Sequence, residues 1–195
     1  MDNIFLTSLW PGLALWIGLY ISDYYLTVSC ARMYRAQEKF VFEGSFELNP
    51  VFQNDIDTLK SVSPRFITFL CLTSMFLWFF WHLTVQPSGL RIAYHFILGY
   101  MIMIELAIHV RHLRNWFLVS KCVGGDGIRG HIEYSRGILL RISAVEFLLF
   151  AGVFSILFLI TSSLFILGGA TSCSLTAWKH YRLAQKYVIP STAVA

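Results

Sequence analysis

The sequence predicts an all-α integral membrane protein: a bundle of five transmembrane helices, with the N-terminus outside, the C-terminus inside and a long amphipathic inside loop between helices 1 and 2. Composition is the first observation behind this prediction. Of the 195 residues, 56% are hydrophobic and 13% are charged, and the mean hydropathy is +0.62. Soluble proteins carry about a quarter charged residues. The composition therefore excludes a soluble domain, a disordered chain, a coiled coil and a disulfide-rich scaffold.

The lengths of the apolar stretches are the second observation. A helix needs about 20 apolar residues to cross about 30 Å of hydrocarbon. Residues 139–178 contain only two charged side chains, Arg141 and Glu146. As one helix this stretch would be about 60 Å long, so it must fold back on itself. We expect the turn at Thr161–Ser163, although Gly168-Gly169 follows shortly after. The five expected spans within this single domain, residues 1–195, cover residues 9–30, 66–85, 90–112, 139–160 and 164–183.

The starts of two spans carry recognisable signals. Pro11 lies in the first turn of the first span, where proline is tolerated. Ser63-Pro64 precedes the second span and is typical of an N-cap followed by proline at the first helical position. The helix of the third span is expected to run on to Val119.

The distribution of the basic residues is the third observation. With five spans, fourteen of the fifteen lysines and arginines lie in or beside the inside loops, residues 31–62 and 113–138, or in the C-terminal tail. Only Arg91 lies outside, as the positive-inside rule requires. The N-terminus has no positively charged region, so we expect no cleaved signal peptide. The expected location is the cell membrane or a bacterial inner membrane.

Three acidic residues within the spans form the most informative pattern. Asp23, Glu105 and Glu146 lie on three different helices, each about 8–11 Å below the inner surface at 1.5 Å per residue. Ionisable groups in a membrane are costly and mark functional sites. We therefore expect these carboxylates to share one layer, as candidate catalytic residues. Neither Arg136 nor Arg141 is spaced along its helix to pair with Glu146.

The third span also carries a candidate metal site. Glu105, His109 and His112 lie on one helix face, because they are four and three residues apart. Oxygen and nitrogen ligands of this kind can bind a divalent metal. The alternative is a buried hydrogen-bonded network without a metal.

Basic residues near the inner surface predict a lipid-binding rim. Arginine recognises phosphate through paired hydrogen bonds, so the expected ligands are anionic lipid headgroups. For Arg141, the alternative is a side chain that only extends to the membrane surface. The candidates are Arg111, Arg114, Arg129, Arg136 and Arg141.

The first inside loop is too long for a simple connection. Aromatic residues alternate with acids from Phe40 to Phe52, which predicts a segment that lies in the interface or covers the bundle as a lid. A short polar helix is expected at residues 54–60. The candidate lid residues are Glu43, Glu47, Asn49 and Pro50.

Several common activities lack their motifs. The chain has no phosphate-binding GxxxxGK[ST], no GxSxG and no HExxH. Its four cysteines are far apart, which argues against a zinc or redox pair. The net charge of +4 comes without a basic-aromatic module, so we expect no nucleic acid as a partner.

Three functions remain open. The first is a subunit or oligomeric interaction component of a membrane assembly, with other membrane subunits or a second copy as partners. The second is a membrane-embedded, metal-dependent enzyme that acts on a lipid or amphiphile at the inner leaflet. The third is a proton or cation transporter or channel. The enzyme predicts that Asp23, Glu105 and Glu146 point into one cavity, and the transporter predicts a water-filled route from His95 to Glu105.

Overall fold

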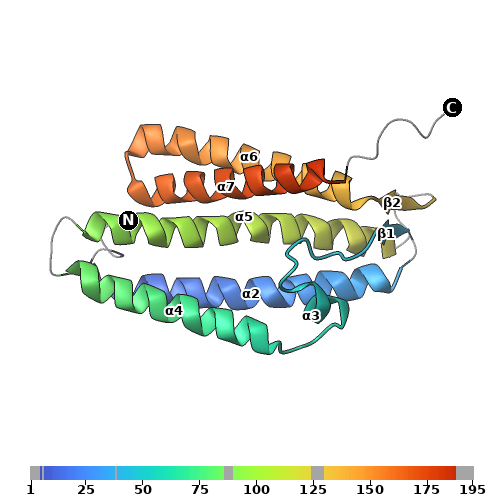
Figure 1. Cartoon of the computed structure of the whole chain (residues 1–195), viewed down its shortest axis with the longest axis horizontal. Helices are drawn as coiled ribbons and strands as arrows, with labels where there is room; N and C mark the ends of the chain where they lie inside the picture. Colours follow the sequence, from blue (N-terminus) through green and yellow to red (C-terminus); the bar gives the residue numbers. More distant parts are fainter. Residues whose placement is uncertain (1–4, 6, 38, 86–89, 124–129, 188–195) are drawn as a thin grey trace.

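The computed structural model of the chain describes residues 5, 7–37, 39–85, 90–123 and 130–187. This part is all-α apart from one short pair of strands (Figure 1). The elements, in chain order, are α2 (Leu9–Arg35), β1 (Phe40–Phe42), α3 (Gln53–Asp57), α4 (Pro64–Val85), α5 (Arg91–Val123), β2 (Ile132–Tyr134), α6 (Arg136–Thr161) and α7 (Leu164–Gln185).

Within the described residues, four helices are long and apolar enough to cross a membrane: α2, α4, α5 and α6. The fifth expected span coincides with α7, which is not among them. Small and hydroxyl-bearing residues such as Gly168, Thr171 and Ser172 lower the hydropathy of α7. The all-α membrane-type bundle is thus supported, whereas the count of five spans stays a prediction.

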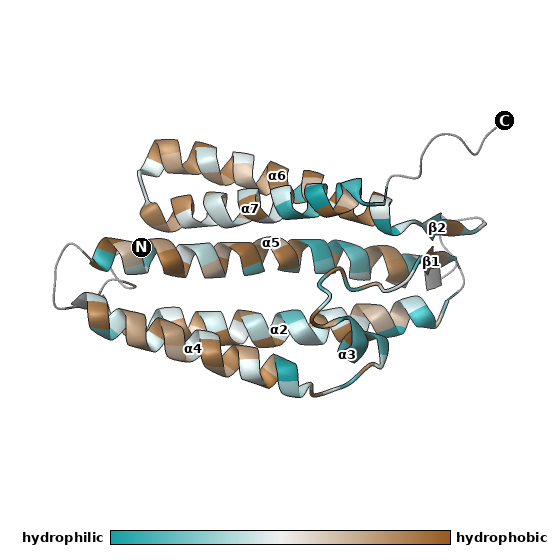
Figure 2. Cartoon of the chain, in the orientation of Figure 1, coloured by the Kyte–Doolittle hydropathy of each residue, from teal (hydrophilic) through white to brown (hydrophobic). Residues whose placement is uncertain are grey.

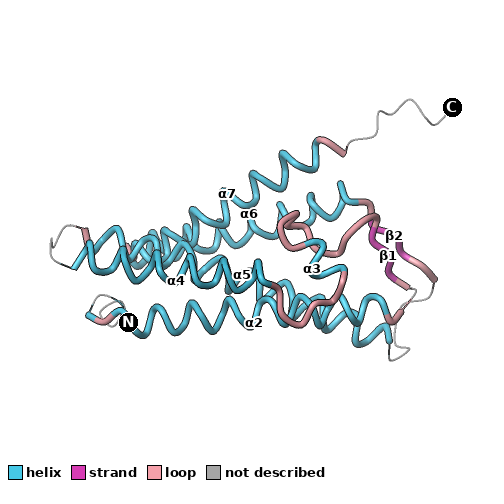
Figure 3. Tube along the Cα trace, turned by 60° about the horizontal axis from the view of Figure 1, so that its bottom comes forward, coloured by secondary structure: helices cyan, strands magenta, loops and turns pink. Residues whose placement is uncertain are grey.

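The long helices lie side by side along the longest dimension of the molecule. The α6–α7 hairpin packs on one side of α5, and α2 and α4 pack on the other (Figure 1). The strands, α3 and the loops that connect them gather at one end (Figure 3), which we call the strand end. Hydrophilic residues on α2, α5 and α7 concentrate toward this end (Figure 2).

Two predicted boundaries are confirmed. Ser63 caps α4, because its Oγ accepts a hydrogen bond from the backbone N–H of Phe66 at 3.2 Å. The turn between α6 and α7 falls at Thr161–Ser163. Ser162 adopts a left-handed conformation there, with φ of 52°, and its N–H donates to the carbonyl of Phe158 at 2.7 Å.

The glycines of α7 serve packing and not the turn. A methyl group built on Gly168 would lie 2.1 Å from the carbonyl oxygen of Phe96, and one on Gly99 would lie 1.9 Å from that of Phe165. The backbones of α5 and α7 therefore approach as closely as glycine permits. Small residues at helix crossings are the usual means of such packing in membranes.

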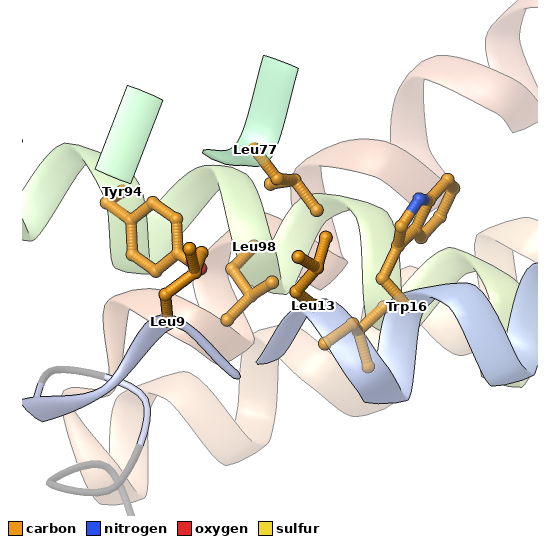
Figure 4. Close-up of a cluster of buried hydrophobic side chains, with 7 residues drawn as sticks. Leu9, Leu13, Trp16, Leu77, Tyr94 and Leu98 are labelled. Atoms are coloured by element: carbon orange, nitrogen blue, oxygen red, sulfur yellow. The ribbon is translucent and has the colours of Figure 1, made fainter. Parts of the chain in front are cut away.

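Buried apolar side chains hold α2, α4 and α5 together at the end opposite the strands. Leu13 and Trp16 of α2, Leu77 of α4, and Tyr94 and Leu98 of α5 point toward one another (Figure 4). Trp16 also donates from its ring nitrogen to Thr73 Oγ1 at 3.2 Å, which links α2 to α4.

The strand pair joins two distant parts of the chain. β1 and β2 run parallel, with Phe40 opposite Ile132 and Phe42 opposite Tyr134. The rings of Tyr34, Phe42 and Tyr134 pack on one another, at centroid separations of 4.6 and 5.7 Å. The loop between α2 and α4 is thereby fixed to the segment that precedes α6.

Several helix bounds differ from those expected. α5 has 33 residues and ends at Val123, so much of the expected inside loop at residues 113–138 is helical. At 1.5 Å per residue α5 is about 50 Å long, which exceeds the hydrocarbon thickness. α2 similarly continues to Arg35. The expected helix at residues 54–60 is the shorter α3.

Candidate functional site

A cavity of about 760 Å³ lies in the strand-end half of the bundle, among α2, α4, α5, α6, α7 and the loop after β1. All three carboxylates that the sequence placed in one layer line it: Asp23 from α2, Glu105 from α5 and Glu146 from α6. Three helices thus bring the in-span acids to one space.

Asp23 and Glu105 form a cluster with His109. One ligand atom from each of these residues lies within 4.8 Å of the other two. Glu105 is only 6% exposed, and its Oε2 has no hydrogen-bond partner in the described part of the chain. This is a group of side chains that could bind a metal ion, although its members differ from those expected from sequence.

The hydrogen bonds of His109 involve both ring nitrogens. Nδ1 lies 2.7 Å from the carbonyl oxygen of Glu105, which can only accept, so Nδ1 carries a proton. Nε2 lies 2.5 Å from Ser22 Oγ, whose own proton is donated to the carbonyl of Leu19 at 3.0 Å, so Ser22 accepts from Nε2–H. Binding of a metal by Nε2 therefore requires the loss of this proton and of the contact with Ser22.

His112 has a different place from the one predicted. Thr27 Oγ1 donates its proton to the backbone carbonyl of Asp23 at 2.9 Å. The contact of 3.0 Å between Thr27 Oγ1 and His112 Nε2 is therefore a hydrogen bond donated by Nε2–H. Nε2 also lies 3.1 Å from Asp23 Oδ1. His112 thus lies against Asp23 without a hydrogen bond to it, and the group of possible metal ligands contains Asp23 in place of His112.

Glu146 pairs with two arginines of α5. Arg111 Nε donates to Glu146 Oε2 at 2.8 Å, and Arg114 contacts the other carboxylate oxygen. The guanidinium of Arg111 also lies over the ring of Phe147, 4.6 Å from its centroid. The side chains of Arg111 and Glu146 are 18% and 15% exposed, so the pair is largely shielded from water.

The predicted arginine rim is only partly gathered at the cavity. Arg111 and Arg114 line it. Arg136 is not among the lining residues and lies over the ring of Tyr187, 5.9 Å from its centroid. Arg141 is exposed and also lies outside the lining. Arg129 is outside the described residues.

The loop after β1 closes one side of the cavity. Of the four candidate lid residues, Glu47, Asn49 and Pro50 line the cavity, whereas Glu43 is exposed and does not. The backbone N–H of Asn49 donates to Glu47 Oε1 at 2.6 Å. Burial raises the pKa of the Glu47 carboxyl, and the hydrogen bond from Asn49 opposes this shift.

The remaining wall of the cavity is aromatic and apolar. Its phenylalanines come from α4, from α6 and from the segment between α2 and α3: Phe40, Phe42, Phe46, Phe52, Phe66, Phe69 and Phe147. Its tyrosines come from α2 and β2: Tyr20, Tyr24, Tyr34 and Tyr134.

Sequence reasoning missed several polar residues at and near the cavity. Ser22 contacts His109 of α5, and Thr27 contacts His112 of the same helix. Ser143 of α6 hydrogen-bonds to His180 of α7 at 2.8 Å. Four-residue spacings reveal neighbours on one helix, and these contacts join different helices.

Asp55 is a further missed residue, next to the cavity in α3. Its side chain is 3% exposed and accepts from Lys60 Nζ at 2.7 Å and from Ser63 Oγ at 2.6 Å. These hydrogen bonds lower the pKa of the Asp55 carboxyl. They fix α3 to the start of α4.

The fold and the site define an all-α protein with membrane-type helices and a polar cavity at one end. Comparisons with protein-family models, with curated proteins and with solved structures find no match to this chain.

Proposed function

We propose that the chain is a membrane-embedded enzyme that acts on the headgroup of a lipid or another amphiphile at the inner leaflet. The observation that carries this proposal is the convergence of Asp23, Glu105 and Glu146 on one cavity. Ionisable side chains are costly inside a membrane, and three of them from three helices favour a site over incidental burial.

The position of the cavity fits a substrate taken from the membrane. α4 has 22 residues and is about 33 Å long, close to the hydrocarbon thickness. Its first turns line the cavity through Phe66 and Phe69. If α4 crosses the membrane, the cavity lies where the hydrocarbon layer meets the inner surface, at the depth of lipid headgroups.

The chemistry of the cavity wall fits an amphiphile. Aromatic rings such as Phe46 and Phe52 offer an apolar surface to a chain, and Arg114 and Lys179 offer positive charge to a headgroup. The Arg114 side chain is 46% exposed even with its contact to Glu146, so part of the guanidinium stays accessible. A volume of about 760 Å³ is within the range of small-molecule sites, about 300–1,000 Å³.

The proposed reaction includes proton transfer at the headgroup. Glu105 is the proposed acid or base, because its Oε2 is buried and has no partner in the described residues. Asp23, which lies beside His112, supports it, and the accessible part of Arg114 together with Lys179 binds the anionic part of the substrate.

Five spans with the C-terminus inside are part of the same proposal. α6 and α7 form a hairpin with a short turn, so α7 returns to the strand end if α6 crosses the membrane (Figure 1). α7 needs little lipid-facing apolar surface, because Gly168, Ser172 and Cys173 are buried against its neighbours. Arg91, the basic residue expected outside, lies at the start of α5, at the end of the bundle opposite the strand end.

The test follows lipid turnover by the purified protein. It is reconstituted in vesicles made from the total lipid extract of the cells that produce it, and lipids are monitored by mass spectrometry. We expect one lipid class to be converted, and Glu105→Gln to slow the conversion about 100-fold or more. Glu133→Gln, an exposed change on β2, is the matched control. No change in any lipid with the unaltered protein would overturn the proposal.

The role as a subunit of a larger assembly stays a prediction. Many apolar side chains of α4 and α6 are exposed, among them Met75, Phe79 and Leu149. Lipid tails cover such surfaces as well as a partner helix does, so this exposure does not favour either.

A further inference from the structure

Asp23, Glu105 and His109 present their ligand atoms to a common point. Because the three atoms lie within 4.8 Å of one another, a point exists no more than about 2.8 Å from all of them. Metal–ligand bonds to oxygen and nitrogen are about 2.0–2.2 Å long. Side-chain movements of less than about 1 Å would therefore bring all three into coordination.

The buried carboxylate supplies a second, independent observation. Glu105 belongs to this cluster and is 6% exposed, and its Oε2 has no hydrogen-bond partner in the described residues. The nearby arginines of α5, Arg111 and Arg114, are engaged with Glu146. The carboxylates of Glu105 and the half-buried Asp23 repel each other, so a cation between them would be stabilising.

From these contacts we infer that Asp23, Glu105 and His109 bind one divalent transition-metal ion, with Zn²⁺ as the representative ion. Two oxygens and one imidazole nitrogen suit such an ion, whereas Mg²⁺ and Ca²⁺ prefer oxygen ligands alone. His109 donates its Nδ1 proton to the carbonyl of Glu105, so Nε2 is the nitrogen that would bind the metal. On binding, Nε2 gives up its proton and its contact with Ser22.

His112 is a positioning residue in this arrangement. Its Nε2 lies 3.1 Å from Asp23 Oδ1 while its N–H is donated to Thr27, so the fixed ring restricts the carboxylate by contact and not by a hydrogen bond. Groups that orient a ligand in this way commonly change metal affinity 10- to 100-fold.

This inference deepens the proposed function and rests on it only for what the ion does there. With the ion bound, Glu105 would act as its ligand, and the ion would take over the role of the free carboxyl by polarising a substrate oxygen or activating a water molecule. Binding itself is independent of turnover, so the two claims can fail separately.

The test measures metal binding by the full chain in detergent after removal of metals with a chelator. Isothermal titration with Zn²⁺ is expected to give one ion per chain, and excess Mg²⁺ is not expected to compete. Asp23→Asn, Glu105→Gln and His109→Gln should each weaken binding at least about 100-fold. His112→Gln should weaken it about 10-fold, and Glu43→Gln, exposed and outside the cavity, is the matched control.

X-ray absorption on the Zn²⁺-loaded unaltered protein gives a readout that needs no variant. Nitrogen and oxygen ligands with imidazole scattering support the inference. No binding, sulfur in the coordination shell, or affinity unchanged in the three ligand variants would overturn it. Zn²⁺ binding without lipid turnover would support the metal site and contradict the proposed enzymatic function. Lipid turnover by a protein that binds no metal would support the enzymatic function and contradict the metal site.

Discussion

Arg111 of α5 donates a hydrogen bond to Glu146 of α6 at 2.8 Å, beside the cavity. The two residues are 35 positions apart, and the bond joins helices that are also linked through α7. The arrangement leaves Asp23 and Glu105 without an arginine, because Arg114 also contacts Glu146. One acid of the layer thus has a fixed structural partner, and the other two form the chemically available part of the site.

The first prediction concerns this ion pair. Glu146→Gln leaves two cations without their carboxylate, and we expect it to lower the free energy of unfolding by about 1–3 kcal/mol. Arg111→Gln should have a similar effect. The double variant should lose less free energy of unfolding than the two single variants lose together. A double-mutant cycle in detergent measures this difference. Arg141→Gln, an exposed change on α6, is the control, and strict additivity would contradict a direct pair.

The second prediction concerns the contact between α5 and α7. Gly99→Ala places a methyl group where the carbonyl oxygen of Phe165 lies, so the helices must separate. We expect a loss of about 3 kcal/mol or more in the free energy of unfolding. Gly152→Ala in α6 is the matched control, because a methyl group there meets nothing within 4 Å.

Helix propensity predicts the direction in which the control variant Gly152→Ala changes the free energy of unfolding. Alanine is better than glycine in a helix interior by up to about 1 kcal/mol, so Gly152→Ala should be neutral or stabilising. Equal thermal unfolding temperatures for the two variants would show that the close approach at Gly99 does not matter for stability.

The third prediction is a pH dependence that comes from Asp55. Hydrogen bonds from Lys60 and Ser63 lower the pKa of this carboxyl in the folded protein. A carboxyl whose folded pKa lies below its unfolded value stabilises the protein above about pH 4, and this stability is lost as the pH falls through the folded pKa.

Unfolding of the unaltered protein and of Asp55→Asn, measured from neutral to acidic pH, checks this prediction. The unaltered protein should be more stable at neutral pH, and the difference should disappear in acid. Lys60→Gln should shift the loss of stability in acid to a higher pH, because the carboxylate of Asp55 loses a hydrogen-bonding cation. A stability difference that stays constant down to low pH would contradict the assignment.

The fourth prediction is the proposed topology. A fluorescent protein fused after the C-terminus and produced in a bacterial inner membrane should fluoresce, because it folds on the inside. Alkaline phosphatase fused after Leu90 should be active, because that position is expected outside. Active phosphatase at the C-terminus would reject the five-span arrangement, since α7 would then not return across the membrane.

Features that depend on local sequence could be predicted. Ser63-Pro64 predicts the start of α4 because capping needs only neighbouring residues, and the fold-back of residues 139–178 follows from length alone. The similar distances of Asp23, Glu105 and Glu146 from the expected span ends favour a common layer, and all three line one cavity. Their presence in one cavity depends also on how each helix is rotated.

Contacts between helices could not be predicted in the same way. Spacing along α6 excludes Arg136 and Arg141 as partners of Glu146, yet it cannot point to Arg111 on another helix. For the same reason the stripe Glu105, His109 and His112 predicts a metal site on one helix, whereas the structure replaces His112 by Asp23 of α2. The pairing of β1 with β2 has no local signal at all.

That strand pair has a consequence for how the protein is made. Chains leave the ribosome from the N-terminus. β1 (Phe40–Phe42) can therefore pair with β2 only after Ile132–Tyr134 has been synthesised. Lys179 and Leu183, which complete the cavity wall, emerge later still. The cavity therefore closes only when nearly the whole chain has been inserted, and a nascent chain halted before α7 has no enclosed site for a ligand.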